Sequence, residues 1–375
     1  MDFDDSPEEA EFRLSLRTWI EHNDPGLPAS STDDAYWAGQ PKWHQSLYDG
    51  GFFGTTWPKE IGGRGLPSVY DVIVDEELAA AGAPPRPSLG YLVEGILEHG
   101  SDEIKGRFLP GIVNGRDRWC QGFSEPDAGS DLASLRTRAD LDGDEYVLHG
   151  HKVWTSYSDD ADWCLVLART NHEVAKHKGI SAFAVPMHQP GIEQRPLPMI
   201  NGITKEFGEV LFDGARVPAA DMIGRPGEGW PLAMTVVSHE REPHQLGFAG
   251  RYGKLVKDLA SRVRSDPSRY GAEQARDLGW AIVETEMLRL HVYRRLSDRL
   301  DGILHGPEGS VDKLLMTWTE QTVGRAALAV GGPGLVGDDT WLKVYLYSRA
   351  QSVMGGTSQI QRNLVAGRIL GLPAS

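Results

Sequence analysis

The pattern of apolar residues changes twice along this chain of 375 residues, and these changes constrain the fold more than any other feature. Before residue 119, segments with helical spacing alternate with glycine- and proline-rich breaks. Residues 119–224 carry short β-rich runs between turn signals, and the helical period returns after Gly227. Helices and strands that are segregated in this way are typical of the α+β class. We therefore predict a helical N-terminal domain, a middle domain with an antiparallel sheet or barrel, and a helical C-terminal domain, over the ranges 1–118, 119–226 and 227–375.

The helices of the first domain are indicated by caps and apolar stripes. Ser6, Pro7 and Glu9 have the spacing of a capping box with proline at the first helical position. Phe12, Leu16 and Trp19 follow at helical spacing and form one apolar face. We expect this face of the helix to pack on the body of the protein. Further helices are expected over 69–81 and 98–113.

Strands are expected in the middle domain wherever β-branched and aromatic residues cluster between turn residues. The predicted strands are 145–148, 152–156, 163–168, 180–185 and 209–212. Gly150 is interpreted as the break between the first two. In the C-terminal domain, helices are expected to be interrupted at 265–271, 302–309 and 331–337.

Charge and cysteine content narrow the class of function. The formal net charge is −15, so we expect no binding to nucleic acid or to an anionic membrane, both of which need basic surface. Two cysteines are too few for a disulfide framework or a thiolate metal site, so we expect a reducing compartment and no metal. The first residues are acidic and no apolar run approaches membrane-spanning length. We therefore expect a cytoplasmic protein.

The densest candidate for a ligand site is residues 119–131, followed by Arg136 and Arg138. Serine hydroxyls and backbone amides beside glycine and proline provide donors without bulk, as a flat polar ligand edge or a phosphate requires. By composition alone, a surface turn that enters a sheet is the favoured interpretation of the same segment.

The order of residues in this segment carries a resemblance to a known family. The run Phe-Ser-Glu-Pro-Asp-Ala-Gly-Ser-Asp at 123–131 is similar to a signature of the acyl-CoA dehydrogenases. The runs Lys-Val-Trp-Thr-Ser at 152–156, Gly-Ile-Ser-Ala-Phe-Ala-Val-Pro at 179–186 and Glu-Val-Leu-Phe-Asp at 209–213 follow at the family's spacing. Gly-Gly-Thr-Ser-Gln-Ile-Gln-Arg at 355–362 resembles its closing motif, and the resemblance extends from Phe12 to Gly371.

The resemblance implies a fold, a cofactor and a set of contacts. The fold would be a helical domain, a β-barrel-like domain and a C-terminal four-helix bundle, with FAD against the β domain and an acyl thioester on the other face of the flavin ring. Phe123 and Ser124 match contacts to the pyrimidine edge, Ser156 matches the residue at flavin N5, and Ser130 matches a residue near the phosphates and the pantetheine arm. The full set of matched cofactor residues is Phe123, Ser124, Gly129, Ser130, Trp154, Thr155, Ser156, Thr357 and Gln359. We also expect Ser358 and Gln361 to form a capping box for the last helix.

The family's catalytic base has two known positions. Many members carry a glutamate just before the Gly-Thr of the closing motif, but Gly355 occupies that position here. A minority branch, which includes bacterial steroid side-chain enzymes, places it on the first helix after the β domain. In this chain that helix offers Glu240, at helical spacing from the apolar residues Ala233, Val236 and Val237. An ordinary ion pair is the structural alternative for Glu240, and Glu242 is the fallback base.

The same resemblance implies a substrate and partners. Arg241 matches a substrate-binding arginine, the substrate is an acyl-CoA or acyl-carrier-protein thioester, and an electron-transfer flavoprotein would accept the electrons. Residues 262–270 lack the family's Arg-x-x-Phe-Gly run, and Leu328 replaces a glutamine that reaches the neighbouring subunit's FAD. We therefore expect either a homo-oligomer or, by the same resemblance, an α2β2 assembly in which a related chain supplies the missing contacts.

Two other functions remain open from the sequence. One is a flavin-dependent oxygenase or oxidase of the same superfamily, in which the glutamate is often absent. The other is a non-catalytic partner subunit, which is the natural role if Glu240 only forms a surface ion pair. The glutamate argues against the first, and the intact motifs at 123–131 and 152–156 argue against the second.

Overall fold

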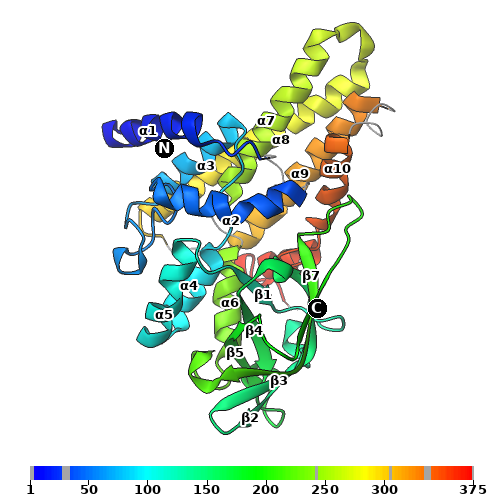
Figure 1. Ribbon diagram of the computed structural model, residues 1–375. Coiled ribbons are helices and arrows are strands. Elements are labelled where there is room, and N and C mark those ends of the chain that lie inside the picture. Colours follow the sequence, from blue (N-terminus) through cyan, green and yellow to red (C-terminus); the bar gives the residue numbers. More distant parts are fainter. Residues whose placement is uncertain (1–3, 28–33, 241–243, 304–305, 333–338, 374–375) are drawn as a thin grey trace. The chain divides into compact units, whose positions relative to one another are not determined.

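The computed structural model describes residues 4–27, 34–240, 244–303, 306–332 and 339–373. The chain separates into two compact units, each described here by itself. The first unit comprises residues 1–36, 64–86 and 241–375, and the second comprises residues 37–63 and 87–240. Helix α2 (Asp34–Asp49) passes from one unit into the other. The described part of the first unit is helical, whereas the second combines helices with the sheet (Figure 1). The α+β class is therefore confirmed, while the predicted boundaries of the three domains stay a prediction.

The helices of the first unit share one apolar core. They are α1 (Pro7–Asn23), α3 (Val69–Ala81), α7 (His244–Ser265), α8 (Ala272–Leu300), α9 (Gly309–Gly331), α10 (Asp339–Ala350) and α11 (Ser358–Leu364). The core is built around the buried side chains Tyr252, Leu288, Val323 and Ala326. Helix α3 has the predicted bounds, and the predicted interruptions near 265–271 and 302–309 separate α7, α8 and α9. The third interruption lies largely outside the described residues.

Helix α1 starts with the predicted capping box. Ser6 Oγ accepts from the Glu9 backbone N–H at 3.3 Å, and Glu9 Oε2 accepts from the Ser6 N–H at 2.7 Å. Phe12 and Leu16 are buried as expected. The third buried position is Ile20, and Trp19 is only half-buried, because Ile20 lies one full turn beyond Leu16.

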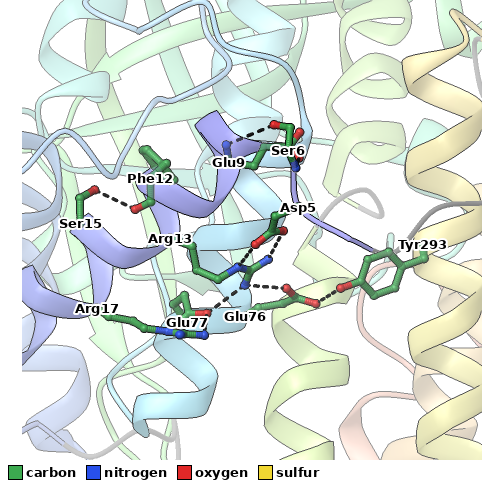
Figure 2. Close-up of polar contacts among 10 residues, drawn as sticks. All are labelled: Asp5, Ser6, Glu9, Phe12, Arg13, Ser15, Arg17, Glu76, Glu77 and Tyr293. Atoms are coloured by element: carbon green, nitrogen blue, oxygen red, sulfur yellow. Dashed lines mark hydrogen bonds and ion pairs between the residues drawn. The ribbon is translucent and has the colours of Figure 1, made fainter.

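Charged residues hold α1 to its neighbours in the first unit (Figure 2). The Arg13 guanidinium donates to Asp5, to Glu76 Oε2 at 3.0 Å and to Glu77 Oε1 at 2.9 Å. Glu76 also accepts from the hydroxyl of Tyr293 on α8. Arg13 thus connects α1 with α3, and the hydrogen bond between Glu76 and Tyr293 connects α3 with α8.

The second unit contains α4 (Gly90–His99), α5 (Asp102–Val113) and α6 (Gly229–Glu240). The single helix predicted over 98–113 is wrong at its start. Helix α4 ends at His99, and a new helix, α5, begins after Ser101. Ser101 Oγ caps α5 because it accepts from the Ile104 N–H at 3.2 Å.

The sheet of the second unit contains eight strands. They are β1 (Trp119–Gly122), β2 (Arg138–Asp142), β3 (Glu145–Ser156), β4 (Trp163–Arg169), β5 (Ile180–Pro186), β6 (Ile192–Pro196), β7 (Phe207–Pro218) and β8 (Met222–Ile223). The order is β6-β7-β3-β2-β4-β5-β8, with β1 paired to β4. The pairs are antiparallel except for the parallel pairs β1–β4 and β2–β4. Its core is formed by buried residues that include Leu148, Val166, Phe183 and Val210.

Gly150 is not the break that the sequence predicted. The two short strands expected at 145–148 and 152–156 form the single strand β3, in which Gly150 pairs with Phe212 of β7. A Cβ atom at residue 150 would lie 2.2 Å from Thr137 Oγ1. Glycine is therefore needed here for a close approach between neighbouring segments rather than for a turn.

Among the described residues, no helix has the combination of length and apolar character that crossing a bilayer requires.

Candidate active site

Two of the predicted cofactor segments lie side by side in the second unit. The Val153 N–H donates to the carbonyl of Ser124 at 3.0 Å, and Lys152 Nζ donates to the carbonyl of Phe123 at 3.1 Å. Phe123 is buried and Ser124 is half-buried. The segment that follows β1 is thus hydrogen-bonded to the last part of β3. These bonds hold Ser124 next to the strand that carries Ser156.

A buried ion pair supports this junction. Lys152 Nζ lies 2.8 Å from Glu125 Oε1, and the side chains are 0% and 7% exposed. The carboxylate also accepts from the backbone N–H groups of Arg136 at 2.7 Å and Thr137 at 2.9 Å. Burial opposes ionisation of Glu125, but the Lys152 charge and these hydrogen bonds hold its pKa below the usual value. Neither residue was predicted as a support, although a lysine inside a predicted strand is a signal for a buried charge partner.

Trp154 has an unusual backbone and an unusual exposure. Its φ is +60°, it lies where the register of β3 against β7 shifts between Lys152 and Thr155, and it is 62% exposed. Its ring meets the ring of Phe207 edge-on at 6.1 Å. A bulge redirects a side chain out of a sheet, and a non-glycine residue at positive φ indicates a position where the surrounding structure maintains strain for function.

The residues beside Trp154 fit a flat polar ligand. Thr155 is buried, and among the described residues its Oγ1 has no hydrogen-bond partner. Ser156 is half-buried and pairs with Phe207 of β7. An outward aromatic ring next to hydroxyl donors can stack on a planar heterocycle and bond its edge.

The turn that contains Gly129 and Ser130 is exposed. It is followed by Asp131, which Lys176 Nζ approaches at 2.7 Å. Lys176 and Lys178 belong to a run of basic residues at 176–178, which none of the family motifs includes although such a run is conspicuous in an acidic chain. Clustered cations beside exposed serine and glycine can hold phosphate groups.

The closing motif lies in the first unit. Thr357, not Ser358, caps α11: its Oγ1 accepts from the Ile360 N–H at 3.2 Å. The predicted capping box is therefore wrong, because Gln361 is turned away from a cap position and donates to the Gly355 carbonyl at 2.9 Å. Gln359 is exposed. At the start of α11, the backbone N–H groups of Ser358 and Gln361 are bonded to the carbonyls of Ser352 and Thr357, and that of Ile360 is bonded to the cap.

Glu240 is the last residue of α6 in the second unit. Ala233 and Val236, on the same helix face, are buried, and Glu240 is half-buried. Its negative charge acts on the phenol of Tyr91 in α4, whose pKa is raised first by burial and then by Glu240. Arg241 and Glu242, the predicted substrate contact and the fallback base, lie outside the described residues.

Comparisons with known proteins identify the family of the whole chain. The chain matches the family models of the acyl-CoA dehydrogenase N-terminal domain over 6–116, middle domain over 120–215 and C-terminal domain over 227–370. It is 36% identical to the acyl-CoA dehydrogenase IpdE1 of Mycobacterium tuberculosis, over 97% of each chain. A solved structure of the Tcur3481-Tcur3483 steroid ACAD is similar with a TM-score of 0.87 and 29% identity, covering 100% of each chain. The ChsE4-ChsE5 complex from Mycobacterium tuberculosis is similar with a TM-score of 0.85 and 27% identity, again over 100% of each chain.

The chain therefore belongs to the acyl-CoA dehydrogenase family. Members of this family are flavin-dependent oxidoreductases that act on CH–CH bonds, and the resemblance inferred from the motifs is confirmed.

Proposed function

We propose that this protein catalyses the FAD-dependent α,β-dehydrogenation of an acyl-CoA thioester, with Glu240 as the base that removes the α proton. The observation that carries the proposal is the junction of Phe123–Ser124 with the bulged end of β3, from which Trp154 projects. An aromatic ring that is exposed at strained backbone, beside hydroxyl donors, is suited to a planar redox cofactor.

In this proposal the β domain binds the flavin end of FAD. Phe123 and Ser124 contact the pyrimidine edge, Trp154 packs on the ring, and Ser156 donates near N5, with Gly129, Ser130 and Thr155 completing the β-domain contacts. Thr357 and Gln359, at the start of α11, are assigned to the flavin as well. FAD supplies an acceptor for the hydride that leaves the β carbon of the substrate.

Glu240 performs the proton step. A proton α to a thioester is removed by a carboxylate that is close to that carbon and partly shielded from water. The half-buried position of Glu240 at the end of an apolar helix face meets the second requirement. Arg241 follows Glu240 directly and is proposed to contact the substrate.

The proposed substrate is a bulky acyl thioester. Gly355 leaves space where many members have a carboxylate, and solved steroid ACAD structures are among the similar proteins. The exposed turn with Ser130 and the basic run at 176–178 are assigned to the pantetheine arm and its phosphates. Coenzyme A is favoured over acyl carrier protein because it presents more phosphate charge to these cations.

We further propose that the chain assembles with a related dehydrogenase chain. Helix α8 exposes the apolar residues Trp280, Val283, Met287 and Leu290 at the 3-4-3 spacing of a helix-packing seam, and its opposite face is buried in the core. Trp318 of α9 extends this surface and is held there by a bond from its Nε1 to Glu284 Oε1 at 2.7 Å. The name of a similar structure, the ChsE4-ChsE5 complex, indicates two different chains.

We propose an electron-transfer flavoprotein as the electron acceptor. We also propose a cytoplasmic location, with which the free, buried thiols of Cys120 and Cys164 agree because the cytoplasm is reducing.

The test is an anaerobic titration of the purified holoprotein with a panel of acyl-CoAs, from short linear to steroid-bearing chains. Bleaching of the flavin band with appearance of the 2,3-enoyl-CoA by mass spectrometry is the expected result. Flavin that bleaches only with an external reductant and then consumes oxygen with substrate would instead indicate a flavin-dependent oxygenase. A colourless chain that stays colourless when a related dehydrogenase chain is co-expressed would indicate a non-catalytic subunit.

A further inference from the structure

Helices α4 and α6 pack closely and run in opposite directions in the second unit. A Cβ atom on Gly95 of α4 would lie 2.6 Å from Val236 Cγ2 of α6, so the two backbones approach as closely as a glycine permits. Near the other end of the contact, His99 Nε2 lies 2.8 Å from Thr235 Oγ1. These two contacts define which residues face each other along the helix pair.

Tyr91 and Glu240 lie one helical turn beyond the contact of Gly95 with Val236. Tyr91 lies four residues before Gly95, and Glu240 lies four residues after Val236. Residues four apart share a helix face, so the two side chains continue the antiparallel contact at its next level. The electrostatic effect of Glu240 on Tyr91 is consistent with this placement. Tyr91 is 8% exposed and Glu240 is half-buried, so water screens their interaction poorly.

We propose that Tyr91 positions Glu240 for proton abstraction: its neutral hydroxyl donates to the carboxylate, keeps it ionised and orients it at the mouth of the acyl site. This inference deepens the proposed function and rests on it. A phenol is a donor to a carboxylate as long as it remains protonated. Burial and the negative charge of Glu240 both raise the pKa of Tyr91, so the hydroxyl stays protonated throughout the working range.

Other titratable groups among the described residues lie on the elements around this pair. The thiols of Cys120 in β1 and Cys164 in β4 act on Tyr91, and burial raises the pKa of Cys120 well above its usual value. Glu94 and His239 flank the pair on α4 and α6, and Glu98 and His99 face Thr235 toward the other end of the contact. In the short helix before β5, His177 packs on Trp230 at the start of α6, and α5 supplies apolar residues to the same core: Ile104, Phe108, Leu109 and Ile112. Of these groups, the Tyr91 hydroxyl is a neutral donor on which the charge of Glu240 acts.

The test is the titration of Glu240 itself, followed by carboxyl-carbon NMR of isotope-labelled glutamate and assigned with Glu240→Gln. In Tyr91→Phe, the pKa of Glu240 is expected to rise by about one unit, because a hydrogen bond to the charged form is lost. The acid limb of the rate of anaerobic flavin reduction by acyl-CoA should move to higher pH by the same amount. Tyr48→Phe, a change in the same core cluster away from Glu240, is the matched control and should move neither value.

The outcomes separate the two proposals. If Tyr91→Phe leaves the Glu240 titration unchanged, the positioning role of Tyr91 is wrong, whatever the activity. If the titration shifts but Glu240→Gln still reduces the flavin at the normal rate, the contact stands and the assignment of Glu240 as base is wrong. Circular dichroism and the flavin spectrum of Tyr91→Phe show whether the variant is folded before either comparison is made.

Discussion

Lys152 and Glu125 form an ion pair of 2.8 Å inside the β domain, with the ammonium group wholly enclosed by protein. The pair does more than neutralise two charges. Lys152 also donates to the Phe123 carbonyl, while Glu125 accepts from the backbone of Arg136 and Thr137. Three backbone segments are held together around two side chains, and two of them, at Phe123 and at Lys152, adjoin residues of the proposed flavin site.

Removing one partner of this pair should lower the free energy of unfolding of the β domain. Lys152→Met leaves the Glu125 carboxylate buried without its cation, which typically costs about 3–5 kcal/mol. The expected result is a large drop in the urea midpoint together with loss of bound flavin. Lys205→Met is the matched control, because its ion pair with Asp159 is exposed and such pairs contribute less than about 1 kcal/mol. Equal effects of the two changes would contradict the structural role given to Lys152.

Replacing Trp154 should weaken flavin binding but leave the free energy of unfolding nearly unchanged. Trp154→Gly removes an exposed ring and relieves a positive φ that costs a non-glycine residue about 1–2 kcal/mol. The free energy of unfolding of the flavin-free protein should therefore change by less than about 1 kcal/mol, while the Kd for FAD rises roughly tenfold. Isothermal titration of the flavin-free protein with FAD measures this. Normal FAD binding by Trp154→Gly would show that Trp154 is not part of the flavin site. Leu141→Gly is the control, because it also removes an exposed apolar side chain.

The Arg13 network predicts a dependence of stability on pH. Burial opposes ionisation of Glu77, but its hydrogen bonds from Arg17 and Arg13 outweigh burial, so its pKa lies below the ordinary value of 4.5. A carboxyl group whose pKa is lower in the folded state stabilises the fold above the unfolded pKa, and this contribution is lost as the pH falls through the folded value. The wild type should therefore lose stability as the pH falls below 4.5.

In Arg13→Ala this loss should be smaller, because less of the stabilisation is present at neutral pH. Thermal melts of the two proteins at a series of pH values measure it. Arg116→Ala provides the control, since its contact with Asp117 is exposed. Parallel pH curves for wild type and Arg13→Ala would show that the network contributes nothing to acid sensitivity.

The exposed seam on α8 predicts a role in assembly. Met287→Glu places a charge in the middle of the apolar residues Trp280, Val283 and Leu290. When the chain is co-expressed with a related dehydrogenase chain, this change should shift the assembly to smaller species in mass photometry. Leu141→Glu, which adds the same charge at an exposed apolar position in β2, should leave the assembly intact. An unchanged assembly in Met287→Glu would exclude α8 as the contact surface.

Local signals in the sequence were sufficient for many elements. The bounds of α3 were predicted because its apolar run is followed by Gly82, which ends the helix at a positive φ of 73°. The start of α1 was predicted because Ser6, Pro7 and Glu9 act within one turn. In both cases the residues that decide the structure are neighbours in the sequence.

Elsewhere the deciding partner is distant in the sequence, and local patterns fail. Gly150 has the composition of a turn, but its role depends on Thr137 lying against it from outside its own strand. The pairing of Lys152 with Glu125 and the effect of the Glu240 charge on Tyr91 likewise depend on how separate elements pack. The family motifs predict Trp154 as a cofactor residue, but its positive φ and its place at the register shift between β3 and β7 are not readable from local sequence.

The most direct test of the central claim is the rate of anaerobic flavin reduction in Glu240→Gln, measured by stopped flow with the acyl-CoA that reduces the wild type fastest. Glutamine keeps the size of the side chain but cannot accept the α proton, so the rate should fall by at least about a thousandfold, within the range of general-base contributions, while the FAD content stays normal. Glu242→Gln, the neighbouring alternative, should remain close to the wild type. Rapid bleaching in Glu240→Gln, or its loss in Glu242→Gln instead, would contradict the assignment of Glu240 as the catalytic base.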